Sequence, residues 1–148
     1  MSRIAFGSFS VVVPPGWADI TDSVEAEEPP FTLAREEGVG ALQFSVALHT
    51  SGPVPDPSPN DLSAMVGSFA AARGLGSPRE VAVESGPPRL AAGSFAWGGD
   101  FLRVWQVSDG HSFALVTYTC ELGREDRELG DCEGIVRSLR FEQASRRA

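Results

Sequence analysis

The chain has 148 residues, of which 42% are hydrophobic and 22% are charged. This composition is typical of one globular domain with a core of its own, and it excludes an intrinsically disordered chain. Acidic residues outnumber basic ones by 20 to 12, for a net charge of −8. That charge argues against nucleic-acid binding, because phosphate contacts require clustered basic side chains.

No targeting or membrane segment is recognisable in the sequence. No apolar run approaches the roughly 20 residues that a membrane span requires. The first residues, Met1 to Gly7, include one arginine and no apolar stretch of signal-peptide length. We therefore expect a cytoplasmic protein that does not bind membranes. All 12 basic residues are arginine, a bias typical of a GC-rich bacterial genome.

Hydrophobic patterns predict three strands in the first third of the chain. Ser8–Val13 is a mostly apolar run that ends at Pro14-Pro15-Gly16, because a strand cannot continue through consecutive prolines. A turn that contains Trp17 follows. Phe31–Arg35 is a second short run, and Ala41–Leu48 has apolar residues at every second position.

A helix is predicted between Ser58 and Gly74. Ser58 is a good N-cap residue, Pro59 suits the first helical position, and Asp61 is placed to close a capping box. Gly74 is the expected stop. The apolar residues at helical spacing are Leu62, Met65, Val66, Phe69 and Ala72.

Four consecutive strands and a second helix are predicted in the rest of the chain. The strands are Glu80–Ser85, Leu90–Trp97, Phe101–Val107 and Ser112–Cys120. Gly-Gly and Asp-Gly turns join the last three strands, which favours antiparallel hairpins. The helix is expected at Arg124–Ser138 and a final short strand at Leu139–Phe141.

The late strands are apolar on both faces, as alternate residues of Phe101–Val107 and Ser112–Cys120 show. A sheet that is apolar on both sides needs a cover on both sides. We therefore predict an α+β fold, an α/β/α sandwich in which a mostly antiparallel sheet of about six to seven strands carries one helix on each face. Residues 1–142 are predicted to form a single domain, and residues 143–148 a flexible C-terminal tail.

Residue types that serve in catalysis occur together once. Ser108, Asp109, His111 and Ser112 lie on one predicted hairpin turn, where neighbouring residues cannot converge as nucleophile, base and orienting group. The other histidine, His49, is not at metal-ligand spacing from His111. The sequence therefore predicts no catalytic residues and no metal site, and we expect a protein that is not an enzyme.

The remaining motifs favour structural roles. Cys120 and Cys132 are interpreted as two buried thiols, with a redox pair as the alternative. Gly38-Val39-Gly40 is not a phosphate-binding loop, because no Gly-Lys-Ser/Thr sequence follows it. No cofactor is expected. Three tryptophans are interpreted as core or rim aromatics rather than a ligand cage: Trp17, Trp97 and Trp105.

Seven carboxylates and a single basic residue, Arg35, fall between positions 19 and 37. The carboxylates are Asp19, Asp22, Glu25, Glu27, Glu28, Glu36 and Glu37. One interpretation is a solvated rim without a partner. The other is a docking surface for a basic protein, because concentrated charge speeds association with an oppositely charged surface. These seven residues are our candidate partner-binding residues.

Three parts of the chain resemble the PsbP/DcrB-like superfamily: Pro14-Pro15-Gly16-Trp17-Ala18-Asp19 after the first strand, the late run of strands, and the closing Ile135-Val136-Arg137-Ser138-Leu139-Arg140-Phe141. This superfamily includes a Ran-binding nuclear import factor and the Eag-type chaperones of type VI secretion. The resemblance implies an α/β/α sandwich with an antiparallel sheet. It also implies binding rather than chemistry, because these families are mostly accessory proteins.

Two functional hypotheses follow, with an uncharacterised accessory protein as the fallback. The first is a cytoplasmic immunity protein, as in toxin–antitoxin pairs, that occludes a cognate secreted toxin; the acidic residues favour it. The second is an Eag-like chaperone that shields an apolar segment of a secreted effector, which an apolar sheet favours. In either case the partner is a protein, and the chain itself is expected to be a monomer or a homodimer.

Overall fold

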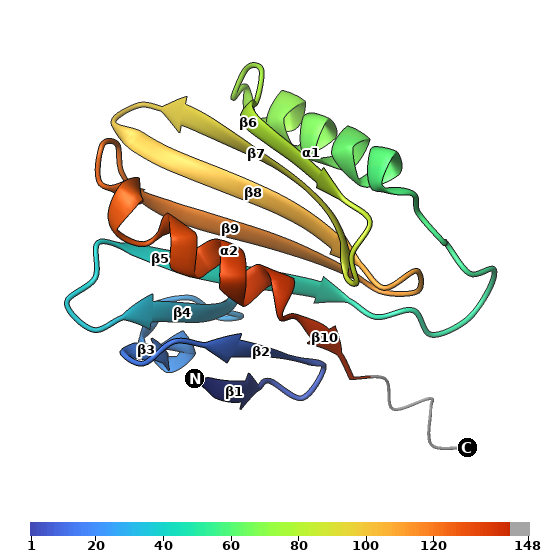
Figure 1. Ribbon diagram of the computed structural model, residues 1–148, viewed down its shortest axis with the longest axis horizontal. Coiled ribbons are helices and arrows are strands. Elements are labelled where there is room, and N and C mark those ends of the chain that lie inside the picture. The colour runs from blue at the N-terminus through green and yellow to red at the C-terminus, as the bar shows by residue number, and fades with distance from the viewer. Residues whose placement is uncertain (143–148) are drawn as a thin grey trace.

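The computed structural model describes residues 1–142, and the predicted tail at 143–148 lies outside these residues (Figure 1). In chain order the elements are β1 (Ser2–Ala5), β2 (Phe9–Val13), β3 (Trp17–Asp19), the 3-10 helix η1 (Thr21–Ser23), β4 (Phe31–Arg35), β5 (Gly40–Ala47), α1 (Pro59–Arg73), β6 (Arg79–Glu84), β7 (Arg89–Trp97), β8 (Asp100–Ser108), β9 (Phe113–Glu121), the 3-10 helix η2 (Glu125–Arg127), α2 (Leu129–Arg137) and β10 (Arg140–Phe141).

Seven strands form one antiparallel main sheet in the order β3-β4-β5-β9-β8-β7-β6. The predicted α+β fold, with an antiparallel sheet of six to seven strands, is confirmed. A second sheet of three short strands, β1-β2-β10, was not predicted. Strand β10 falls within the short strand predicted at Leu139–Phe141, and β2 within the one predicted at Ser8–Val13. Strand β1 was not predicted, because it is four residues long and largely exposed.

Helix α1 covers one face of β6, β7 and β8. Its predicted start is confirmed: Asp61 N donates to Ser58 Oγ at 3.0 Å, and Ser58 N donates to Asp61 Oδ2 at 2.9 Å. Gly74 ends the helix in the left-handed conformation, with φ of 65°. The residues that α1 buries are Leu62, Val66 and Ala70, which pack on Ala91, Phe95 and Val104.

The predicted apolar stripe of α1 is therefore rotated from the observed one. Phe69 is half-buried and Ala72 is exposed, while Ala70 lies in the core. The buried residues of α1 are spaced four apart, at positions 62, 66 and 70. Phe69 therefore lies at the edge of the face that packs on the sheet. There the Arg73 guanidinium lies 3.7 Å from the centre of the Phe69 ring.

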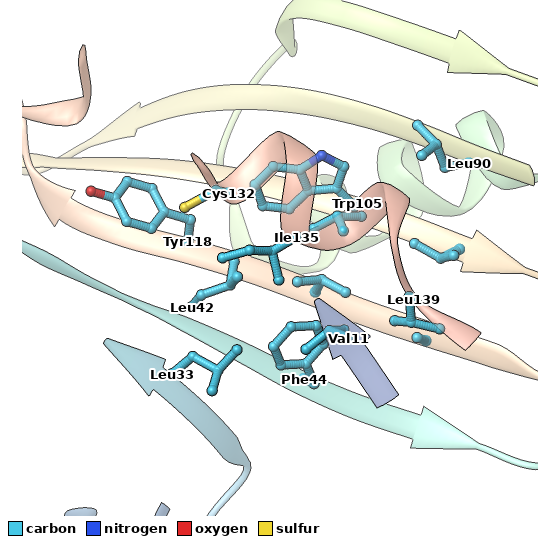
Figure 2. Packing of buried hydrophobic residues seen from close by; sticks show 14 of the residues in the cluster. Val11, Leu33, Leu42, Phe44, Leu90, Trp105, Tyr118, Cys132, Ile135 and Leu139 are labelled. Atoms are coloured by element: carbon cyan, nitrogen blue, oxygen red, sulfur yellow. The ribbon is translucent and has the colours of Figure 1, made fainter. Parts of the chain in front are cut away.

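Helix α2 lies on the opposite face of the main sheet, beside β2 (Figure 1). Figure 2 shows Cys132 and Ile135 of α2 directed at Leu42, Trp105 and Tyr118 of the sheet, in the larger of the two apolar clusters. The helix is shorter than the predicted 124–138. Its start is displaced because the backbone of Glu128 leaves the helical region, with φ of −131°.

We predict that Leu62→Ala destabilises the protein more than Phe69→Ala, although phenylalanine is the larger residue. Leu62 is 0% exposed, so its truncation leaves a cavity and is expected to cost about 2–5 kcal/mol. Phe69 already contacts solvent, and part of its site can rehydrate. Urea unfolding of the two variants measures the difference. A larger loss for Phe69→Ala would mean that the helix packs in the orientation that the sequence pattern predicted.

Candidate functional site

Five of the seven candidate carboxylates lie at the end of β3 and on the connection from β3 to β4: Asp19, Asp22, Glu25, Glu27 and Glu28. All five are exposed. Asp19 Oδ1 accepts a hydrogen bond from Thr21 N at 2.9 Å, which shapes the start of the connection. Within residues 1–142 none of the five forms an ion pair. Their charge is therefore uncompensated locally.

Glu36 and Glu37 form the turn between β4 and β5, so the length of β4 separates them from the four carboxylates of the β3–β4 connection. Strand pairing brings other carboxylates to the same end of the main sheet: Gly40 lies opposite Cys120, and Asp100 lies opposite Glu121. We call this end the acidic end and define it by Glu36, Glu37, Asp100, Glu121, Glu125 and Asp126. The sequence did not predict this grouping, which depends on pairing between distant segments.

The acidic end also exposes two large apolar side chains. Trp97 is 61% exposed and Leu122 is 45% exposed. They lie near each other, because Trp97 is opposite Asp100 at the β7–β8 turn and Leu122 N donates to Gly99 O at 2.9 Å. An exposed tryptophan among charged residues has the composition of a protein interface, where aromatic anchors are enriched.

A fully buried carboxylate lies directly behind the acidic end. The side chain of Glu128 is 0% exposed. Tyr118 Oη donates to Glu128 Oε1 at 2.8 Å, and the amides of Val39 and Gly40 donate to the two carboxylate oxygens at 3.2 and 3.1 Å. Arg35 Nε completes the set at 3.3 Å. A buried carboxylate is tolerated only with such a set of donors.

Two glycines make this arrangement possible. A Cβ atom at position 40 would lie 2.8 Å from Cε1 of Tyr118, and one at position 38 would collide with the Glu128 carboxylate. Gly38-Val39-Gly40 is thus a loop whose backbone amides bind a carboxylate of the same chain. A signal for Glu128 exists in the sequence: it lies four residues before Cys132 and seven before Ile135, on the apolar stripe of α2.

Other acidic residues of α2 also face inward. Trp17 Nε1 donates to Asp131 Oδ2 at 3.0 Å, and Trp105 Nε1 donates to Glu133 Oε2 at 3.2 Å. Glu133 Oε1 accepts a 2.6 Å hydrogen bond from Nε of Arg103, which is only 4% exposed. These contacts hold α2 on the sheet. They also explain the two buried tryptophans, whose indole N–H groups need partners.

The side chains of the β8–β9 turn, where residue types of catalysis occur together, form hydrogen bonds that shape the turn. Asp109 Oδ1 accepts hydrogen bonds from the amides of His111 and Ser112, and Ser112 Oγ accepts one from His49 N. The rings of His49 and His111 meet edge to face at 6.0 Å, a proximity that the sequence did not predict. Within residues 1–142, no three His, Cys, Asp or Glu side chains converge as metal ligands.

Both cysteines are buried free thiols, as interpreted from the sequence. Burial raises the pKa of Cys132 and of Cys120 above the usual value, which disfavours the reactive thiolate. No helix in the described part of the chain is long and apolar enough to cross a membrane.

The chain matches no protein-family model and no curated protein, but solved structures share its architecture. The Ran-binding protein Mog1p of Saccharomyces cerevisiae superposes with a TM-score of 0.62 at 10% identity, covering 97% of this chain and 96% of that one. PsbP (CyanoP) of Synechocystis gives 0.58 at 10% identity, covering 95% and 92%. The chain has the PsbP-like fold. The fold that the sequence resemblance implied is therefore confirmed.

A third structure, from Bacteroides thetaiotaomicron, gives a TM-score of 0.59 at 15% identity. The match covers 93% of this chain and 46% of that protein, so this chain spans about half of its length. At these identities the similarity shows the fold alone.

We predict that Tyr118, the single tyrosine of the chain, does not ionise while the protein is folded. Burial of the phenol, and then its hydrogen bond to Glu128, raise the pKa of Tyr118 above its ordinary value of 10.0. Above about pH 10 the unfolded chain loses this proton and the folded chain keeps it. The stability that Tyr118 contributes is therefore complete below about pH 10 and falls as the pH rises further.

Ultraviolet absorbance of tyrosinate, recorded beside circular dichroism, tests this expectation. The tyrosinate signal should appear only together with unfolding, and the urea-unfolded chain should titrate normally as the control. Ionisation near pH 10 in a chain that is still folded would show that Tyr118 is not held by Glu128 in a buried site.

Proposed function

We propose that this chain is a non-enzymatic binding protein that docks a basic protein partner at its acidic end. More narrowly, we propose an immunity protein of the bacterial cytoplasm that occludes a secreted toxin. The observation that carries the proposal is the exposed Trp97 and Leu122 among the carboxylates of the acidic end. Of these carboxylates, only Glu121 has an ion pair within residues 1–142, with Arg124 at 3.6 Å.

The surface combines the two properties that such docking needs. Trp97 offers a large apolar side chain to a pocket of the partner, the kind of residue that dominates interface energetics. The surrounding carboxylates repel acidic surfaces, attract basic ones and accelerate encounter. The five carboxylates between Asp19 and Glu28 add to the long-range attraction without belonging to the contact surface.

The fold is compatible with this role. Mog1p, which shares it, is named as a Ran-binding protein, so a domain of this architecture can serve as a protein-binding module. Ran itself is not proposed as the partner of this chain, because the arginine-only composition is bacterial in character.

The chaperone alternative has less support from the geometry. It requires an apolar groove in which a client segment is shielded. Most large apolar side chains of the main sheet pack instead against α1 or against α2 and β2, in the two core clusters, whereas Val81, Val83 and Trp97 are exposed. At the acidic end, the exposed carboxylates favour a charged partner over an apolar segment.

Two charge-matched triple variants test the proposal. Glu36→Gln/Glu37→Gln/Glu121→Gln alters the acidic end, and Glu25→Gln/Glu27→Gln/Glu28→Gln alters the loop before β4. Each removes three charges from exposed positions, so each should leave the melting temperature nearly unchanged. We expect the acidic-end variant to lose about tenfold or more in affinity, and the loop variant to lose only on-rate at low salt.

The measurement is capture of the partner from the native host, its identification by mass spectrometry, and binding kinetics at low and high salt. Above about 0.15 M salt, where the Debye length is only about 8 Å, the loop variant should bind like the wild type. Trp97→Ala should accelerate dissociation at every salt concentration. Capture that is indifferent to Trp97→Ala and to both triple variants would contradict the proposal.

A further inference from the structure

A cleft of about 760 Å³ lies at the end of the molecule opposite the acidic end. Its walls come from β1, the β6–β7 turn, the β8–β9 turn, the C-terminal end of α2 and β10. Arg89 and Ser108, which lie opposite each other at this end of β7 and β8, both line it, whereas Trp97 and Asp100 mark the other end of the same strands. In Figure 1 the β8–β9 turn, which contributes to the cleft, is on the right, and the β7–β8 turn of the acidic end is on the left.

Among the residues that line the cleft, basic side chains outnumber acidic ones, which is the reverse of the balance in the whole chain. Four arginines line it, Arg3, Arg89, Arg137 and Arg140, against two carboxylates, Asp109 and Glu142. In the whole sequence, carboxylates outnumber arginines by 20 to 12. A third of all arginines therefore lie around one concave site, although they come from three distant parts of the sequence.

Two of these arginines are held in place by carboxylates outside the cleft. Arg89 Nη1 pairs with Asp56 Oδ1 at 2.7 Å, and Arg137 forms a two-pronged contact with Glu84, with Nη2 at 2.6 Å from Oε2. The pairs cancel formal charge but fix the positions of both guanidinium groups. Each guanidinium has five N–H donors, so neither is exhausted by its partner.

The other two arginines have no carboxylate partner within residues 1–142. Both flank Ser10 of β2 in the small sheet: Arg140 is its register partner on β10, and Arg3 of β1 donates from Nη1 to Ser10 Oγ at 2.8 Å. Arg3 and Arg140 are exposed. They add two positive charges without an ion-pair partner among the described residues to the lining of the cleft, which also includes Arg137.

We propose that this cleft binds a small anion with at least two negative charges, carried on phosphate or carboxylate groups. The volume is that of a small-molecule site. Planar guanidinium forks match both phosphate and carboxylate oxygens, and pre-positioned donors reduce the entropy lost on binding. A singly charged anion would gain little binding free energy, because Asp109 and Glu142 also line the cleft and would repel it.

Calorimetric titration of the full chain at constant ionic strength tests the site, with inorganic pyrophosphate and citrate as probes. We expect saturable binding of at least one probe. Saturation by pyrophosphate alone would assign a phosphate site, and saturation by citrate alone a carboxylate site. Chloride at matched ionic strength controls for screening.

Variants then locate the binding. Arg140→Gln should weaken it about tenfold, as expected for the loss of one charge-assisted contact, and Arg140→Lys should weaken it less because the charge is kept. Arg3→Gln/Arg140→Gln should abolish saturation. Arg73→Gln, an equal loss of charge on α1, should change nothing. No saturable binding of either probe by the folded wild type, or equal weakening by Arg73→Gln, would overturn the proposal.

Discussion

The buried carboxylate of Glu128 is the contact on which this structure most depends. It joins the β4–β5 turn, through the amides of Val39 and Gly40, to a part of the chain almost 90 residues away. That part is β9, through Tyr118, and the start of α2, through the backbone of Glu128 itself. A carboxylate in this position would be strongly destabilising without its donors. Because all of them are present, the contact fixes where α2 begins and where the turn lies.

That placement decides which charges remain for other molecules. The carboxylates that point inward and bind the sheet are Glu128, just before α2, and Asp131 and Glu133 on the helix. Glu36 and Glu37 are instead exposed on the β4–β5 turn, whose amides bind Glu128. Strand pairing then places Trp97, Asp100 and Glu121 at one end of the sheet and Arg89, with the arginine-lined cleft, at the other. The net charge alone describes neither end. An acidic surface for a basic protein and a basic cleft for a small anion can coexist because the length of β7 and β8 separates them.

The sequence predicts features that depend on neighbouring residues and misses those that depend on distant ones. The capping box of α1, the late hairpins and the two-faced apolar strands are local, and the structure has all three. The small sheet is not predictable in this way, since β1 is mostly exposed and β2 pairs with β10 from the other end of the chain. The acidic end requires the pairing of β5 with β9 and of β9 with β8. The candidate carboxylates are exposed, but β4 separates those before it from Glu36 and Glu37 after it. Their closeness in the sequence does not show this separation in space.

Amide hydrogen exchange of Val39 and Gly40 tests most directly whether Glu128 organises this end of the molecule. If it does, both turn amides exchange as slowly as core amides of β9 such as that of Val116, because they open only when the domain unfolds. In Glu128→Gln they should exchange at least about 100-fold faster, through local opening, since an amide side chain cannot accept from all the donors. Exchange of Val39 and Gly40 at the rate of an unprotected peptide in the wild type, or at an unchanged rate in Glu128→Gln, would contradict this account.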